Sequence, residues 1–304
     1  MFMDDTMLAA TRRPPIISHL GIRRYAERPP KPTARGTAMR YSSAYGCERA
    51  LGYAAVGFAP SNPMGEGDAG AAFFGTLVHE DTQEAILATF AGVEVEVPSE
   101  DANATISGSA DGLISVTNFP DYVSTIGGTH ILWELKTMGE YAFDKQVGFN
   151  RRSNAVREGT GPARKAIAQA GMNALNIMRE RPGVVIDHLV LGSICTSPLS
   201  VAKSRAMRVD GIDRLVAEYW IPRDLWEPLA MAEVARMAQI ANDVGHGYLP
   251  DRIVVDDDGE TRVILDPQSH RGAPWQCDYC SYRDTCVADG PGVVRILESR
   301  GMES

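Results

Sequence analysis

The chain has 304 residues and a mass of 33.0 kDa, which is enough for one large domain or two small ones. Its formal net charge of -9 argues against a protein that coats nucleic acid, because neutralising phosphates requires clustered Lys and Arg. The composition is that of a soluble globular protein, with neither a membrane-spanning run nor a hydrophobic signal core, so we expect a cytoplasmic protein with no membrane partner.

Residues 1–38 are rich in Pro and Arg and show little hydrophobic periodicity. We therefore expect a flexible basic arm. Two roles are open for this arm: it contacts a phosphate backbone, or it is a plain disordered leader.

Residues 40–53 are predicted to begin a helix, with Ser42 or Ser43 as the N-cap and Cys47 in the first turns. A lone Cys on a helix is usually a small buried hydrophobe, so this position alone does not identify a ligand. Residues 54–70 contain several Pro and Gly and are predicted to form a loop.

Residues 75–90 are predicted to form the next helix, with His79 at the edge of its apolar stripe. Two interpretations of His79 are open: a boundary histidine whose ring bonds a backbone carbonyl, or a member of a functional site. The stripe comprises Phe74, Leu77, Val78, Ala85, Ile86 and Phe90.

Two predicted strands, residues 105–116 and 130–137, carry the acids of most interest. Side chains alternate between the two faces of a strand, so Glu134 and Lys136 share one face of the second strand. If the two strands pair, Asp111 lies beside Glu134, and two close carboxylates repel unless a cation neutralises them. This pattern predicts a site for a hard metal ion.

The later segments complete an α/β pattern. A short helix or loop is expected at residues 137–150, strands at 184–194, 213–221, 253–255 and 262–265, and helices at 162–178 and 223–244. Gln169 and Asn173 lie on the helix at 162–178, where an ordinary polar face is one interpretation. Cys195, at the end of a buried strand, is expected to pack in the core.

Cys277, Cys280 and Cys286 form a C-x2-C-x5-C cluster in a chain with only five cysteines. Three cysteines within ten residues predict a metal centre, which needs a fourth ligand. Cys47 and Cys195 are the remaining cysteine donors.

The ordered set of Gly75-x3-His79, Asp111-Gly112, Glu134-x-Lys136 and Gln169 resembles the motif series of the RecB-like nucleases in the PD-(D/E)xK superfamily. The chain departs from that series at two places: Ala110 replaces the Pro before Asp111, and Asn173 replaces the usual Tyr after Gln169. The resemblance implies an α/β fold with a PD-(D/E)xK restriction-endonuclease-like core, in which helices flank a mixed sheet.

A Cys before the nuclease motifs and a C-x2-C-x5-C cluster after them resemble the iron-sulfur nucleases, including the free-standing CRISPR-associated exonucleases of Cas family four. By that resemblance Cys47, Cys277, Cys280 and Cys286 hold a [4Fe-4S] cluster, with zinc as the alternative. The implied organisation is a flexible arm at 1–38, a single nuclease domain at 39–290 whose iron-sulfur lobe joins the two ends, and a tail at 291–304.

The resemblance also implies an activity, that of a Mg2+- or Mn2+-dependent DNA exonuclease. His79, Asp111, Glu134 and the Leu135 carbonyl would bind the metal, and Lys136, Glu134, Asp111 and Gln169 would be catalytic. The implied substrate is DNA that is single-stranded or has free ends, and the implied partners are proteins of CRISPR adaptation or of phage or host recombination. Related nucleases form homo-oligomeric rings. The alternative is a non-catalytic DNA-binding or assembly subunit that keeps the fold.

Overall fold

The computed structural model describes twelve segments of the chain, and the expected basic arm at residues 1–38 lies outside them. The described residues are 39–62, 66–100, 106–121, 126–150, 155–156, 159–196, 208–209, 212–213, 216–255, 261–268, 275–278 and 280–296.

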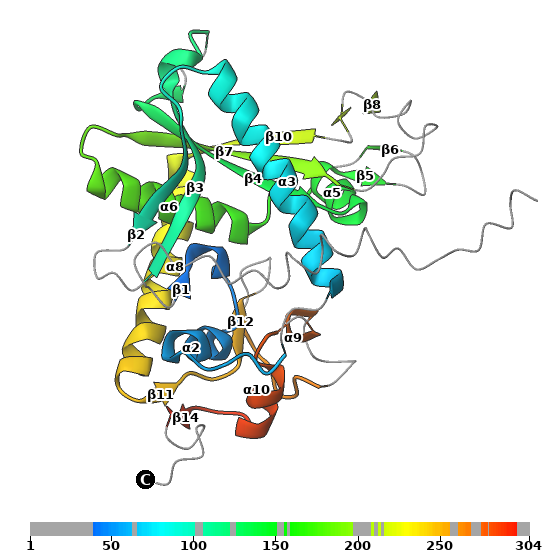
Figure 1. The fold of residues 1–304 in the computed structure, drawn as a ribbon, viewed down its shortest axis with the longest axis vertical. Coiled ribbons are helices and arrows are strands. Elements are labelled where there is room, and N and C mark those ends of the chain that lie inside the picture. Colours follow the sequence, from blue (N-terminus) through cyan, green and yellow to red (C-terminus); the bar gives the residue numbers. More distant parts are fainter. Residues whose placement is uncertain are drawn as a thin grey trace, which may run out of the picture.

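The protein is an α/β structure built on a six-stranded mixed sheet (Figure 1). The strand order is β1-β3-β4-β7-β10, with β2 paired on β3. The β1–β3 and β4–β7 pairs are parallel, and the other pairs are antiparallel. The strands are β1 (Met39–Arg40), β2 (Glu94–Glu100), β3 (Ile106–Ser115), β4 (His130–Met138), β7 (Ile186–Cys195) and β10 (Val216–Pro222).

Helices cover both faces of this sheet. The helical segments are η2 (Tyr41–Ser43), α2 (Glu48–Val56), α3 (Glu66–Thr89), η3 (Val116–Asn118), α5 (Glu140–Val147), α6 (Arg164–Glu180), α8 (Arg223–Gly245), α9 (Trp275–Asp278) and α10 (Arg283–Asp289). On one face, Val78 and Ile86 of α3 pack against Trp133 and Leu135 of the sheet. On the other face, α6 and α8 pack together over a larger core that includes Leu132.

Strand β3 changes partners along one of its edges, and this change positions the site. Because β2 runs along one edge of β3, β1 and β4 share the other. The pairing with β4 spans Gly112–Ser115, whereas β1 pairs only at Ile106 and Ser107. The intervening residues 108–111 lie where β4 and β1 leave a gap between them.

A second group of elements lies below the sheet in Figure 1 and brings together segments far apart in sequence. Helix α2 lies there beside α9 and α10, and Tyr53 of α2 packs with Cys286 of α10. Within the described segments there are also four two-stranded pairs: β5 (Phe149–Asn150) with β6 (Ala155–Val156), β8 (Arg208–Val209) with β9 (Ile212–Asp213), β11 (Tyr248–Leu249) with β14 (Val294–Arg295), and β12 (Ile253–Val255) with β13 (Thr261–Val263).

Strand β14, which lies beyond the expected domain boundary at residue 290, pairs with β11, and Ile296 packs against the same small core. The expected tail at 291–304 therefore contributes a strand to the fold. Residues 256–260, between β12 and β13, lie outside the described residues, although the two strands that flank them pair.

Two helix starts differ from the sequence predictions. Helix α2 begins at Glu48 with Cys47 as its N-cap, rather than at Ser42 or Ser43, because buried Tyr41 holds the preceding residues in the separate η2 turn. Helix α3 begins at Glu66, within the stretch predicted as a loop. The expected apolar stripe is also partly wrong, since Phe74 and Leu77 are 59% and 45% exposed.

The remaining predicted elements are confirmed within a few residues, including the two central strands and the helices now seen as α6 and α8. Leu225, in the first turn of α8, is exposed. No helix among the described residues combines the length and apolar character needed to cross a membrane.

Candidate functional site

The acids singled out from the sequence line one cavity of about 410 Å³ at the gap between β1 and β4. His79 of α3, Asp111 of β3, Glu134 and Lys136 of β4 and Gln169 of α6 all contribute to its wall. The sheet and the helices on its two faces thus bring together residues from four separate elements.

Asp111 is fixed by the strand next to it. The ladder between β3 and β4 ends at the pair Gly112–Trp133, and the Asp111 Oδ2 atom accepts the next free backbone N–H, that of Leu135, at 2.7 Å. The other oxygen, Oδ1, lies 3.5 Å from His79 Nδ1. The predicted neighbourhood of Asp111 and Glu134 is therefore confirmed, and His79 faces the site rather than a backbone carbonyl.

Glu134, Lys136 and Gln169 form a closed hydrogen-bonded triangle. The Lys136 Nζ atom donates to Glu134 Oε1 at 2.7 Å and to Gln169 Oε1 at 3.0 Å, and Gln169 Nε2 donates to Glu134 Oε1 at 2.7 Å. The expectation that Glu134 and Lys136 share one face of the strand is confirmed. Leu135 packs in the core of the opposite face and contributes its backbone N–H, while its side chain does not line the cavity.

The two oxygens of Glu134 have different surroundings. Oε1 accepts both donors of the triangle, whereas Oε2 is buried and has no hydrogen-bond partner among the described residues. Burial is the main cause that raises the pKa of Glu134 from its ordinary value of 4.5 to about 7; Lys136 lowers it, and the charge of Asp111 raises it further.

Glu96 and Gln83 belong to the site but were missed in the sequence. The Gln83 amide donates to Glu96 Oε1 at 3.1 Å and to the Asp111 carbonyl at 3.3 Å, and Glu96 lines the cavity. The signal for Gln83 is its spacing four residues after His79, because residues at i and i+4 share a helix face. Glu96 has a φ of 50°, which no local pattern predicts.

Asn173, which replaces the usual Tyr, has a structural role here. Its side chain is fully buried, accepts from Ser99 Oγ at 2.7 Å and donates to the Ser109 carbonyl at 3.1 Å. These bonds tie α6 to β2 and β3 at the edge of the cavity.

The cavity suits a divalent cation in its chemistry, although the ligands are not gathered around one point. Among the described residues, no three His, Cys, Asp or Glu side chains meet closely enough to hold a metal ion. Lys136 and Gln169 instead occupy one oxygen of Glu134. The unpartnered Oε2 of the same carboxylate is the atom that a bound cation would satisfy, since a buried acceptor without a partner is costly.

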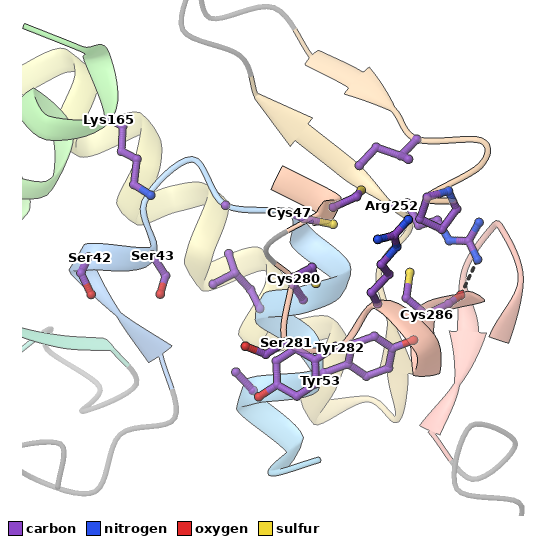
Figure 2. A pocket seen from close by; sticks show the side chains of 18 residues that line it. Ser42, Ser43, Cys47, Tyr53, Lys165, Arg252, Cys280, Ser281, Tyr282 and Cys286 are labelled. Atoms are coloured by element: carbon purple, nitrogen blue, oxygen red, sulfur yellow. Dashed lines mark hydrogen bonds between the residues drawn. The ribbon is translucent and has the colours of Figure 1, made fainter. Parts of the chain in front are cut away.

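Four of the five cysteines line a second cavity, of about 350 Å³, between α2 and the C-terminal helices. Cys47, Cys277, Cys280 and Cys286 contribute to its wall, and Figure 2 labels three of them around the same space. Cys195 lies elsewhere, in a core with Phe143 and Phe149, so its expected packing role is confirmed. Of the two candidates for a fourth cysteine beside Cys277, Cys280 and Cys286, only Cys47 lines this cavity.

The cysteine cavity is a poor place for free thiolates. Burial raises the pKa of Cys47 to about 12 and that of Cys277 to about 11. A bound metal ion reverses this preference, because ligation deprotonates a thiol outright. The four cysteines are the type of donor that a thiolate-ligated metal uses, although among the described residues no three of them meet closely enough to hold a metal ion.

The two cavities are neighbours along the chain. Ser42, in η2, lines both of them.

A scan of protein-family models finds no match to this chain, and a search of curated protein sequences also finds none.

Proposed function

We propose that the protein is a metal-dependent DNA exonuclease with the PD-(D/E)xK core of the RecB-like branch. The observation that carries the proposal is the meeting of Asp111, Glu134 and Lys136 in one cavity, with Gln169 bonded to the last two. An acid on one strand beside a Glu-x-Lys on its antiparallel neighbour is the arrangement that the resemblance implies. The mixed sheet with helices on both faces supports the same proposal.

The carboxylates of Asp111 and Glu134 would hold Mg2+ or Mn2+, with the His79 imidazole and the Leu135 carbonyl as further ligands. The chemistry that such an ion supplies is polarisation of a phosphoryl oxygen and a lower pKa of bound water. Release of Glu134 Oε1 from the triangle, or use of its free Oε2, leaves this carboxylate able to bind.

The ammonium group of Lys136 is placed where it can stabilise negative charge in the cavity. Its side chain lines the cavity and is 30% exposed, while Glu134 fixes its ammonium group, so the cation is anchored yet accessible. In the proposed reaction it orients the attacking water and offsets the negative charge that builds on the phosphoryl oxygens. Gln169 holds the ammonium in that position.

The test is cleavage of end-labelled single- and double-stranded DNA in the presence of Mn2+. We expect Lys136→Ala to abolish cleavage while Mn2+ binding and DNA binding persist. Lys145→Ala, which removes an exposed lysine from α5, is the matched control and should cleave normally. Wild-type cleavage by Lys136→Ala would overturn the assignment.

We propose that Cys47, Cys277, Cys280 and Cys286 hold a [4Fe-4S] cluster that joins the two ends of the folded domain. Their shared cavity of about 350 Å³ supports the proposal, and a single zinc ion is the alternative occupant. The role is structural, since hydrolysis of a phosphodiester moves no electrons.

The substrate under this proposal is DNA that is single-stranded or has free ends, in the cytoplasm. Trimming of CRISPR spacers and recombination or repair, in a phage or its host, are the settings in which such an activity serves, together with their protein partners. A homo-oligomeric ring is the assembly that the resemblance implies.

A non-catalytic DNA-binding or assembly subunit is the second candidate. One observation favours it: the described residues do not gather three metal ligands around one point. Wild-type protein that binds labelled single-stranded DNA but leaves it intact in Mn2+ would establish this alternative, whereas Mn2+-dependent cleavage would exclude it.

A further inference from the structure

Arg252 is a buried cation on the wall of the cysteine cavity. It lies between β11 and β12, and only 3% of its surface is exposed. The Nη1 atom donates to the Leu265 carbonyl at 3.2 Å, and Nη2 donates to the carbonyl of Cys286. Figure 2 shows Arg252 with Cys47, Cys280 and Cys286 around the same space.

The guanidinium lacks a counter-charge within the part of the chain that the structure describes. None of the ion pairs there involves Arg252, and its Nε atom is buried without a hydrogen-bond partner. Arginine stays protonated in proteins, so it cannot avoid the cost of burial by losing its proton. A buried charge without a partner is strongly destabilising, so the cavity calls for an anion.

The thiols identify the class of that anion. Arg283, which also lines the cavity, already has a carboxylate partner, with its Nη1 atom 3.6 Å from Asp278 Oδ1. Four thiolates carry more negative charge than a zinc ion or an iron-sulfur core cancels, so a thiolate-ligated centre is anionic as a whole. The cations that line the cavity are Lys165, Arg252 and Arg283, and Arg252 is the one whose guanidinium bonds the backbone of a cysteine of the set, at the Cys286 carbonyl. Such a centre would therefore pair with Arg252.

We infer that Arg252 is the counter-charge of the metal centre held by Cys47, Cys277, Cys280 and Cys286, and that it positions the Cys286 backbone through the bond to its carbonyl. This inference rests on the proposed metal centre but not on the proposed nuclease activity. Arg252 thus acts on the centre from outside its ligand set, where partners of metal ligands commonly tune affinity and potential.

The experiment compares wild type with Arg252→Gln, Arg252→Lys and Arg49→Gln, all purified without oxygen. Arg49 is the matched control because it is fully buried in the same group of elements and bonds backbone carbonyls, of Pro250 and Gly292, but does not line the cavity. The measurements are iron, acid-labile sulfide and zinc per chain, the rate of metal loss to a chelator, and the reduction potential of any cluster.

We expect Arg252→Gln to lose its metal about ten- to a hundred-fold faster than wild type, as other partners of metal ligands do when they are removed. Any cluster that it retains should have a more negative reduction potential, because a nearby positive charge is gone. Arg252→Lys keeps the charge and should retain metal to within about tenfold of wild type. Arg49→Gln should retain it as wild type does.

Wild-type retention and potential in Arg252→Gln would overturn the inference while leaving the metal centre intact. If Arg252→Gln does not fold, Arg252→Lys decides: a folded Arg252→Lys that has lost its metal shows that charge is not what the centre requires. Wild-type protein with neither iron nor zinc would overturn the metal centre and this inference together, whereas the nuclease proposal is decided separately by Lys136→Ala.

Discussion

Two opposing effects act on the pKa of Glu134. Burial favours its neutral form, while Lys136 at 2.7 Å favours the carboxylate. Because burial is the larger cause, the residue keeps its proton to about pH 7 when no metal is bound. Metal binding at this residue must therefore compete with a proton near neutral pH.

The raised pKa of Glu134 predicts how stability depends on pH without metal. Between 4.5, the ordinary pKa, and about 7, the unfolded chain has released this proton and the folded chain still holds it. The folded state binds more protons in this window, so the contribution of Glu134 to the free energy of unfolding falls as pH rises through it. Urea unfolding in EDTA at a series of pH values measures the trend.

Glu134→Gln is the control for that measurement, because the amide fills the same space and does not titrate in this range. The free energy of unfolding of wild type minus that of Glu134→Gln should decrease as pH rises from 4.5 to about 7. Excess Mn2+ should reduce the decline in wild type only. A pH-independent difference in EDTA would show that the carboxyl titrates normally.

At the scale of elements, the crossing of α6 and α8 depends on a glycine. A Cβ atom at Gly171 would lie 2.7 Å from the Ala230 Cβ atom and 3.1 Å from the Trp226 ring. Both neighbours are fully buried, so neither can move aside easily. The glycine therefore sets how closely the two helices approach, and α6 is the helix that carries Gln169.

We expect Gly171→Ala to lower the free energy of unfolding by about 1–3 kcal/mol through overpacking, even though Ala is the better helix former. Gly245→Ala, at the end of α8, is the matched control, because a Cβ atom at this position would have no neighbour within 4 Å. It should be neutral or stabilising by at most about 1 kcal/mol. Equal denaturation midpoints for the two variants would contradict the packing argument.

The sequence predicts elements well where local pattern and tertiary packing agree. The strand at 130–137 combines β-branched and aromatic residues with buried positions, and β4 spans His130–Met138 as expected. Prediction fails where distant contacts decide. The η2 turn exists because Tyr41 is buried beside Asn176 of α6, and no local signal records that contact.

The same division applies to the candidate site. Asp111, Glu134 and Lys136 are predictable because strand alternation and antiparallel pairing place them. Glu96 is not predictable, since its position depends on an unusual φ and on a bond from Gln83 on another element. The position of Arg252 beside the cysteines is likewise not predictable from local sequence, because three distant segments form the cavity that it lines.

At the scale of the whole molecule, the elements around the cysteine cavity join the beginning of the described chain to its end. Arg49 of α2 bonds the carbonyl of Gly292, and Tyr53 donates to Asp289 Oδ2 at 2.6 Å. These contacts close a loop that contains every strand of the six-stranded sheet except β1. A metal centre on Cys47 and the C-terminal cysteines would reinforce the same closure.

This closure predicts that metal content and thermal stability fall together in Cys277→Ala. We expect iron and acid-labile sulfide to be lost and the melting temperature to drop, because the free energy of metal binding contributes to folding. Cys195→Ala is the matched control: it creates a cavity in a separate core and should lower the melting temperature without loss of metal. Full metal content in Cys277→Ala would contradict the proposed ligand set.

The position of Ser42 has a consequence for chemical damage. This residue belongs to the walls of both cavities and stands five positions before Cys47 in the chain. The short segment from Ser42 to Cys47 thus connects the cysteine cavity to the cavity that contains Asp111 and Glu134. Oxidation of Cys47 that displaces this segment would therefore also change the shape of the second cavity.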